Sequence, residues 1–292
     1  MKCNLCPRRC NAERTDFENN GGFCKAPMLP KIARAGLHFW EEPCISGRNG
    51  SGTVFFSGCS LNCVYCQNFD VSRGIVGKTV SYERLAEIFR ELEEKGAHNI
   101  NLVTPTHYVH AIKRALDIYR PKIPIVYNSG GYDSVNTIKS LKDYVDIYLM
   151  DFKYKSCEKS EKYSSADDYP QVAEEAILEA YSQAGECKLN SDGIMQKGLI
   201  IRHLLMPQGT NQAIEVFNWV RKNTPNAHFS IMSQFTPLAN LRDYPEINRK
   251  ITKREYEKVL DVICESGFEN CFFQSIDSSD KKYIPSFDLE GV

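Results

Sequence analysis

The chain has 292 residues, of which 42% are hydrophobic and 25% are charged, and its formal net charge is −1. This length suits one large α/β barrel or two ordinary domains, and the near-neutral charge argues against nucleic acid or an anionic membrane as the main partner. No apolar stretch approaches the roughly 20 residues of a membrane span, and the N-terminus lacks the apolar segment of a signal peptide. Twelve cysteines without such a signal favour metal ligation over disulfides and indicate a reducing, cytoplasmic location.

Residues 1–30 are expected to form a small metal-binding lobe, because so short a segment without apolar periodicity cannot build its own core. Four closely spaced thiols describe a closed site, which is structural or electron-transferring; they are Cys3, Cys6, Cys10 and Cys24. Zinc, a rubredoxin-like iron and a second [4Fe–4S] cluster all fit this donor set. Arg8 and Arg9 either offset the negative charge of a tetrathiolate site or are solvated.

Residues 31–52 are expected to be a connector, because glycine and proline interrupt them repeatedly. From residue 53 to 292 the chain alternates between apolar strands and amphipathic helices, which predicts parallel strands joined by crossover helices. The expected strands are 53–57, 99–103, 123–127, 145–150, 198–205 and 228–233. The expected helices are 81–95, 107–119, 134–141, 171–184, 211–222 and 252–266. Residues 152–170 are expected to be an irregular loop.

Three further thiols follow the first expected strand at C-x3-C-x2-C spacing: Cys59, Cys63 and Cys66. A [4Fe–4S] cluster normally takes four thiolates, so a set of three leaves one iron free to bind a substrate or cofactor. The alternative is a structural zinc site completed by Cys44 or a histidine, but zinc ribbons usually combine two short cysteine pairs. The isolated cysteines are expected to be packing residues; they are Cys157, Cys187, Cys264 and Cys271.

This spacing, with Tyr65 before the last cysteine and Gln67-Asn68 after it, resembles the radical S-adenosylmethionine (SAM) superfamily. The resemblance implies a partial (β/α)6 TIM-like barrel with its site at the C-terminal ends of the strands. It also implies that the three thiolates hold a [4Fe–4S] cluster, that the fourth iron chelates SAM, and that reductive cleavage yields a 5′-deoxyadenosyl radical. The aromatic ring at the position of Tyr65 packs beside the adenine of SAM in this superfamily.

Within the superfamily, residues 50–240 resemble the glycyl-radical-enzyme activases, especially the pyruvate formate-lyase activating enzyme-like proteins. The four N-terminal thiols resemble the N-terminus of the same proteins. Asn68 matches an activase asparagine that contacts SAM. The second strand departs from the family, since Thr104-Pro105-Thr106-His107 stands in place of a Gly-Gly-Glu motif. Thr104 and Thr106 are therefore the candidates for the SAM amino group, although Thr106 is equally consistent with a helix N-cap.

Motifs at the third and fourth strands imply further SAM contacts. Asn128-Ser129-Gly130-Gly131 resembles an element near the SAM methionine or ribose, which implies contacts from Asn128 and Ser129; a plain turn is the alternative. Met150-Asp151-Phe152-Lys153 resembles a motif in which Lys153 would reach the SAM carboxylate region and Asp151 would help to hold a monovalent cation. Because residues two apart on a strand share a face, a structural ion pair is the alternative for Asp151 and Lys153.

The last two strands carry one strong match and one substituted motif. Arg202, followed by His203 and Met206-Pro207, resembles the activase arginine that binds SAM, and His203 is expected in the core. Gln234 occupies the place of a Tyr-His pair, so it is the candidate for a contact with the SAM ribose.

The resemblance implies an activase that abstracts hydrogen from a glycine of a partner glycyl radical enzyme and takes electrons from flavodoxin or ferredoxin. Such a role requires a wide and lightly covered SAM face, because a protein loop has to enter. The substituted second- and sixth-strand motifs keep an alternative open, in which the enzyme modifies a small molecule or another protein residue. The alternative of a different class is a catalytically inactive, metal-stabilised binding protein.

Overall fold

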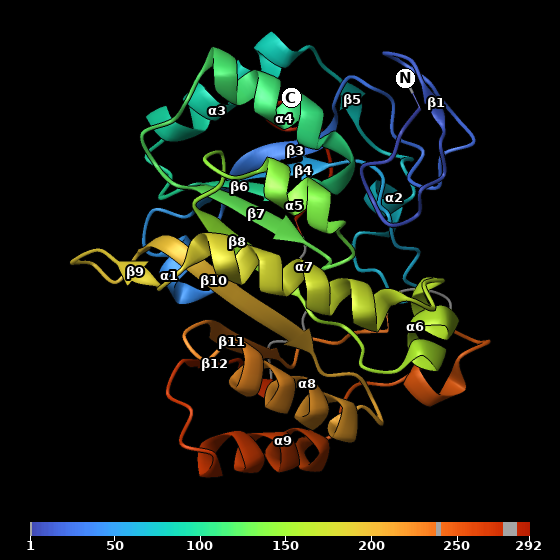
Figure 1. Ribbon diagram of the computed structural model, residues 1–292, viewed down its shortest axis with the longest axis vertical. Coiled ribbons are helices and arrows are strands. Elements are labelled where there is room, and N and C mark those ends of the chain that lie inside the picture. Colours follow the sequence, from blue (N-terminus) through green and yellow to red (C-terminus); the bar gives the residue numbers. More distant parts are fainter. Residues whose placement is uncertain (1, 238–240, 277–284) are drawn as a thin grey trace.

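The structure is a computed structural model that describes residues 2–237, 241–276 and 285–292. Its centre is a curved ten-stranded sheet with the order β12-β11-β10-β8-β7-β6-β4-β3-β5, and β9 pairs with β10 (Figure 1). The strands are β3 (Lys31–His38), β4 (Ser51–Phe56), β5 (Lys78–Thr79), β6 (Ile100–Val103), β7 (Ile125–Ser129), β8 (Ile147–Asp151), β9 (Lys188–Leu189), β10 (Met195–Leu204), β11 (His228–Met232) and β12 (Cys271–Phe273).

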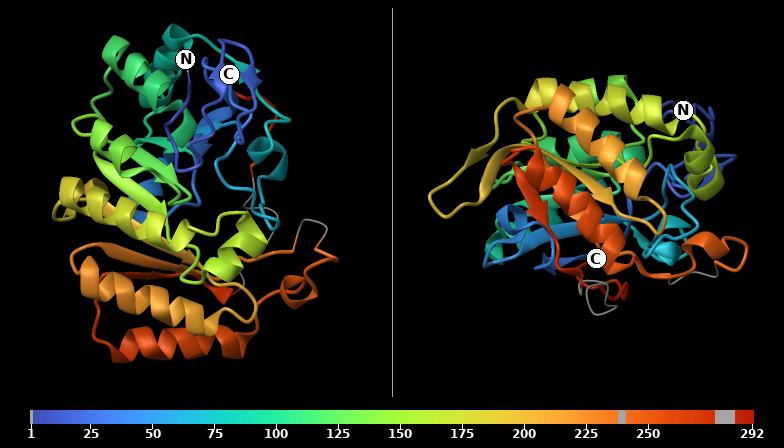
Figure 2. Two further views of the ribbon diagram at one scale, coloured as in Figure 1. Left: turned by 45° about the vertical axis from the view of Figure 1, so that its right-hand side comes forward. Right: turned by 90° about the horizontal axis from the view of Figure 1, so that it is seen from below.

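Seven neighbouring strands of this sheet run parallel: β4, β6, β7, β8, β10, β11 and β12. The crossover helices lie along the outer side of the sheet (Figure 2). They are α3 (Tyr82–Glu94), α4 (Val109–Ile118), α5 (Val135–Ser140), α7 (Tyr169–Ala184), α8 (Thr210–Asn223) and α9 (Lys253–Glu265). The six expected strands and six expected helices are all present, so the predicted α/β fold of the partial-barrel type is confirmed.

Serine side chains cap the first turns of two helices. The Ser81 side chain accepts a hydrogen bond from the backbone N–H of Arg84 at the start of α3, and Ser134 accepts one from Thr137 at the start of α5. Thr106 is not an N-cap: it is the first residue of the 3-10 helix η1 (Thr106–Tyr108), and its hydroxyl donates to Asp133.

The segment 31–52, predicted as a connector, contributes to the main sheet. Strand β3 pairs antiparallel with β4 and also with β5, and the short helix α1 (Pro43–Ser46) follows it. Much of β3 is buried on both faces, which removes the polar–apolar alternation that would have predicted a strand. The C-terminal residues return to this strand, where the Ala35 N–H donates to the Glu290 carbonyl at 2.8 Å.

The segment 152–170, predicted as irregular, contains the helix α6 (Cys157–Ser164). The Ser156 side chain caps its first turn, and Ser165 ends it in the left-handed conformation at φ 51°. The helix has few apolar residues, so the periodicity that identified the longer helices is missing here. The 3-10 helix η2 (Pro245–Ile247) lies beside α6, where Tyr163 donates to Glu246 at 2.6 Å.

The N-terminal lobe is a short antiparallel pair, β1 (Glu13–Arg14) and β2 (Asn19–Asn20), with irregular chain on either side. It packs on the barrel through polar contacts: Arg14 Nη1 donates to the His107 carbonyl at 2.9 Å, and the Ser134 hydroxyl donates to the Leu5 carbonyl at 3.1 Å. Helix α2 (Phe69–Ser72) is next to this lobe (Figure 1). Among the described residues, no helix is long and apolar enough to cross a membrane.

Three histidines of the barrel lie against backbone carbonyls rather than in the candidate site; His107 and His203 are buried, and His110 is partly buried. Burial lowers the pKa of His107 to about 3 and the pKa values of His110 and His203 to about 4. The His203 Nδ1 lies 2.6 Å from the Phe152 carbonyl, as expected of a core residue.

These histidines predict acid sensitivity of the fold. Below pH 6.5 these histidines become protonated in the unfolded chain but stay neutral in the folded chain. The free energy of unfolding therefore falls between about pH 6.5 and pH 4. At pH 5 His203 alone is expected to lower the free energy of unfolding by roughly 2 kcal/mol relative to neutral pH. Urea unfolding at pH 7 and pH 5 measures this effect. The decrease in the free energy of unfolding from pH 7 to pH 5 should be smaller for His203→Gln than for the wild type. An equal loss in both proteins would contradict this expectation.

Candidate active site

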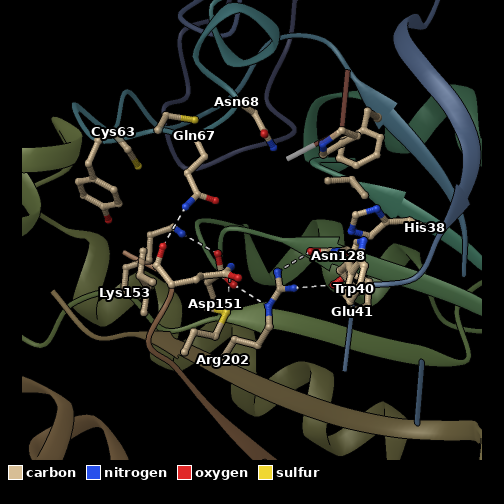
Figure 3. Close-up of a pocket in the computed structure, with 18 of the residues that line it drawn as sticks. His38, Trp40, Glu41, Cys63, Gln67, Asn68, Asn128, Asp151, Lys153 and Arg202 are labelled. Atoms are coloured by element: carbon tan, nitrogen blue, oxygen red, sulfur yellow. Dashed lines mark hydrogen bonds and ion pairs between the residues drawn. The ribbon is translucent and has the colours of Figure 1, made fainter. Parts of the chain in front are cut away.

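A cavity of about 410 Å³ lies at the carboxyl ends of the parallel strands (Figure 3). Its volume is within the range of small-molecule and cofactor sites. Because these strand ends meet on one face of a barrel, the fold brings together side chains that are far apart in sequence. Its lining includes nine of the residues singled out from the sequence: Cys63, Tyr65, Cys66, Asn68, Asn128, Asp151, Lys153, Arg202 and Gln234.

The three-cysteine loop follows β4 and forms one wall of this cavity. Cys63 and Cys66 line it, whereas Cys59 is not among the lining residues and packs against the hydrophobic core. Burial, with smaller contributions from the nearby Cys63 and Cys66, raises the pKa of Cys59 to about 12. Two donors already point at sulfur: the Leu61 N–H at 3.3 Å from Cys59, and the Ser164 hydroxyl at 3.0 Å from Cys63.

This donor set fits an iron–sulfur cluster. Three neighbouring thiols with N–H and O–H donors to their sulfurs match the thiolate ligation of such clusters, and bound iron would offset the charge that burial otherwise disfavours. Among the described residues, no three His, Cys, Asp or Glu side chains converge closely enough to share one metal ion. A four-iron cluster does not need such convergence, since each thiolate binds a different iron.

The opposite wall is a buried network centred on Arg202 (Figure 3). Its Nε donates to Asp151 at 2.9 Å, its Nη1 to Glu41 at 3.1 Å, and its Nη2 to Asn128 at 2.7 Å. The pairing of β10 with β8 sets Arg202 directly beside Asp151. Lys153 completes the network by donating to the second oxygen of Asp151 at 2.5 Å. The structural ion pair between Asp151 and Lys153 is therefore present, and a monovalent cation at Asp151 stays a prediction.

The network shifts the pKa values of its two carboxyl groups in opposite directions. Burial by itself would raise the pKa of Asp151, but the adjacent Lys153 and Arg202 cations hold it below its ordinary value. Burial raises the pKa of Glu41, and Arg202 offsets only part of this effect. Arg202 has five N–H donors, and three of them bond to described residues, so with respect to that part of the chain two remain for a ligand.

Three predicted SAM residues are not among those that line the cavity: Thr104, Thr106 and Ser129. The hydroxyls of Thr106 and Ser129 donate instead to buried Asp133, at 2.7 and 2.6 Å, and Tyr127 donates to the same carboxylate at 2.7 Å. These bonds join the ends of β6 and β7 behind the cavity. A positioning role thus accounts for both hydroxyls.

The sequence reasoning missed the contribution of the segment after β3. His38, Trp40 and Glu41 line the cavity, and Glu41 also accepts hydrogen bonds from Asn101 at 3.2 Å and Asn128 at 3.3 Å. The available signal was an acidic pair, Glu41-Glu42, placed directly after an aromatic run. Trp40 is 59% exposed, so the cavity reaches the protein surface on this side.

Gly131 fixes the loop after β7. Its φ is 78°, and a Cβ there would lie 2.1 Å from the Asp151 carbonyl oxygen. Gly131→Ala is expected to lower the free energy of unfolding by about 3 kcal/mol, because left-handed strain adds to a backbone clash. Gly96→Ala is the matched control, since φ is 81° there and nothing lies within 4 Å; its expected cost is about 1 kcal/mol. Equal losses in urea unfolding would rule out the clash.

The four N-terminal thiols form a second group, in the N-terminal lobe. Burial raises the pKa of Cys6 to about 12, and the charges of Cys24, Cys3 and Cys10 contribute to this shift. In the described residues these thiols do not converge closely enough to share one metal ion. Arg14 Nη1 lies 3.5 Å from the Cys3 sulfur, and Asn19 Nδ2 lies 3.8 Å from the Cys24 sulfur. The metal of this group stays a prediction.

Comparisons with known proteins agree with the fold. A profile described as the Radical SAM superfamily matches residues 53–195. The uncharacterized protein MJ0674 of Methanocaldococcus jannaschii is 32% identical over 270 residues, which cover 89% of this chain and 73% of that protein. Among solved structures, SuiB of Streptococcus suis bound to the precursor peptide SuiA is 15% identical, with a TM-score of 0.53 over 74% of this chain and 46% of SuiB. A second crystal structure of SuiB from Streptococcus suis gives 14% identity and a TM-score of 0.51 over 75% of this chain and 47% of that one. The chain thus spans about half the length of SuiB.

Proposed function

The chain belongs to the radical SAM superfamily, and from this premise we propose that it abstracts hydrogen from a protein substrate, with a glycine of a partner glycyl radical enzyme as the first candidate. When bound, the iron–sulfur cluster and SAM supply a 5′-deoxyadenosyl radical for that step. The observation that carries the proposal is that Cys63 and Cys66 open on the same cavity as Asn128, Lys153 and Arg202.

Different residues of the cavity would bind the cluster and SAM. Cys59, Cys63 and Cys66 would hold the cluster. Lys153 and the two unused N–H groups of Arg202 would bind the SAM carboxylate, and Asn128 and Asn68 offer amide groups on either side of the cavity. Tyr65 is buried, and its ring lies 5.8 Å from that of Phe235, which makes one end of the cavity apolar.

Support for a protein substrate comes from the rim of the cavity. Trp40 lines the cavity and is 59% exposed, and its neighbour Phe39 is 49% exposed. Exposed aromatic residues beside a polar cavity suit a peptide segment better than a small polar metabolite. The expectation of a lightly covered face also concerns residues 277–284, which lie outside the described residues, between the lining residues Gln274 and Pro285.

The test is anaerobic incubation of the reduced, cluster-loaded enzyme with SAM and a candidate glycyl radical enzyme. A glycyl radical signal in the EPR spectrum, absent with the Cys63→Ala variant, is the expected result. Formation of 5′-deoxyadenosine without a glycyl radical on any candidate partner would contradict activation and leave SAM cleavage intact. We propose flavodoxin or ferredoxin as the electron donor in this assay.

The second candidate function is modification of another protein residue or a small molecule. It is favoured by the substituted motifs, since Thr106 is tied to Asp133 and Gln234 replaces the activase histidine. SuiB, which shares the fold, was solved with a precursor peptide. Mass spectrometry of peptides incubated with the enzyme would detect such a modification as a mass change dependent on SAM and reductant.

We propose a second metal at the four N-terminal thiols. Cys6 is buried within this group, so Cys6→Ala is expected to remove that metal while the cluster at residues 59–66 remains. Metal analysis per chain should show a loss in Cys6→Ala but not in Cys157→Ala, whose thiol is exposed and isolated. Equal metal content in both variants would contradict the second site.

A further inference from the structure

A chain of hydroxyl groups leads from the cavity wall to a cysteine of the cluster loop. The Tyr65 hydroxyl lies 2.6 Å from that of Tyr154, which lies 2.8 Å from the Ser164 Oγ. The Ser164 Oγ in turn lies 3.0 Å from the Cys63 Sγ. Burial raises the pKa values of Tyr65 and Tyr154, so both rings stay neutral donors. With Tyr65 as the first donor, each hydroxyl donates once and the last hydrogen bond ends on sulfur.

Ser164 is well fixed for this contact. It is the last residue of α6 and is fully buried, with 0% of its surface exposed. Its position depends on the end of that helix, where Ser165 adopts the left-handed conformation. A hydrogen bond to a cluster sulfur stabilises the added negative charge of the reduced state, and such bonds are among the terms that set the reduction potential.

Arg8 joins this helix end to the cluster loop. Its Nε donates to the Ser60 carbonyl at 2.9 Å, its Nη1 to the Ser165 carbonyl at 2.5 Å, and its Nη2 to the Ser164 carbonyl at 3.4 Å. A cation is favourable at the C-terminus of a helix, where carbonyl groups lack partners. The guanidinium carbon also lies 3.9 Å from the centroid of the Phe23 ring and 5.0 Å from that of Tyr132, so both rings make cation–π contacts with it.

The sequence position of Arg8 gives this contact a wider role. Arg8 lies between Cys6 and Cys10 of the N-terminal thiol group, and Ser60 lies between Cys59 and Cys63. A second contact joins the two loops, because the Cys24 carbonyl lies 2.4 Å from where a Cβ on Gly58 would be. The two groups of thiols therefore share a boundary made of backbone and one arginine.

We propose that Ser164 and Arg8 are positioning residues for the cluster: Ser164 donates a hydrogen bond that raises the reduction potential of the cluster, and Arg8 holds Ser164 in place. The N-terminal thiol loop is thereby coupled to the electron-accepting step. This inference rests on cluster binding in the proposed function, but not on the identity of the substrate.

The test is an EPR-monitored redox titration of the reconstituted cluster without SAM or substrate. Ser164→Ala is expected to shift the midpoint potential to more negative values, and Ser164→Thr, which keeps the hydroxyl, to restore it. Arg8→Gln should shift the potential in the same direction by a smaller amount. The double variant should shift it no further than Ser164→Ala alone, because both act through one contact. Ser160→Ala and Arg9→Gln are the matched controls, since Ser160 bonds within α6 and Arg9 is exposed.

Each outcome decides the proposal. Wild-type potential in Ser164→Ala, or the same shift in Ser164→Thr, would overturn the role of the hydroxyl. If Ser164→Ala loses the cluster while Ser164→Thr and Ser160→Ala retain it, the positioning role is supported by iron content instead. An Arg8→Gln potential equal to that of wild type would overturn the coupling. Failure of the proposed substrate reaction is distinguishable, because these potentials are measured without turnover.

Discussion

Replacing Cys63 with alanine is expected to lower 5′-deoxyadenosine formation by more than about 100-fold and to deplete bound iron. Substituting a residue that only hydrogen-bonds to a metal ligand already lowers metal affinity or activity by about 10–100-fold, and loss of a ligand should have a larger effect. Cys63 both lines the cavity and receives the Ser164 hydrogen bond. Loss of this thiolate would leave two ligands for a cluster that normally requires at least three in this arrangement. Iron content and product formation are measured together after anaerobic reconstitution.

The matched control for this variant is Cys264→Ala. Cys264 is an exposed cysteine of α9, away from both thiol groups in sequence. It should keep wild-type iron and wild-type product. If Cys63→Ala also keeps both, the three-cysteine loop is not the site of the cluster.

Arg202→Gln is expected to be the most destabilising of the substitutions considered, lowering the free energy of unfolding by about 3–5 kcal/mol. The reason is that Asp151 and Glu41 lie beside Arg202 largely out of solvent, with side-chain exposures of 14% and 11%. Removing the cation leaves Asp151 with Lys153 alone and takes Arg202 away from Glu41, so desolvation disfavours both carboxylates more strongly. Urea unfolding of the metal-free protein under reducing conditions measures the effect.

The contrast is the pair of Arg120 with Asp146, whose side chains are 40% and 36% exposed. Solvent screens such a pair, so Arg120→Gln should cost less than about 1 kcal/mol. Comparable losses for the two variants would show that the network around Arg202 is not stabilised by its buried charges.

The elements that the sequence predicts well are those with a regular apolar pattern. Strands β4, β6, β7, β8, β10 and β11 are apolar runs, and the long helices carry apolar stripes bounded by caps, so local sequence determines them. The cysteine triplet is equally local. Strand β3 and helix α6 were missed because one is covered on much of both faces and the other has few apolar residues.

The candidate site was predictable where a motif ends a strand, and not where tertiary placement decides. Asp151 and Arg202 follow from strand order, since β8 and β10 are neighbours in the sheet. Glu41 follows β3, which pairs antiparallel with β4. This pairing depends on tertiary structure, so the acidic pair in the sequence does not by itself place Glu41 in the cavity. Likewise, only the fold brings Asp133 within reach of Thr106 and Ser129 and thereby turns both hydroxyls away from the cavity.

The network also changes the expected role of Arg202. The sequence resemblance implies an arginine that binds SAM, whereas three of its five donors already bond to protein groups. Arg202 can therefore contribute both to the stability of the cavity and, through its remaining donors, to ligand binding. The unfolding experiment on the metal-free protein measures the first contribution separately from the second.

We propose that this chain cleaves SAM at a cluster held by Cys59, Cys63 and Cys66. Anaerobic reconstitution with iron and sulfide, followed by reduction, addition of SAM and quantification of 5′-deoxyadenosine, tests this proposal. We expect a cluster EPR signal that changes when SAM is added, together with 5′-deoxyadenosine in the wild type and not in Cys63→Ala. A fully loaded and reduced cluster that yields no 5′-deoxyadenosine would contradict it.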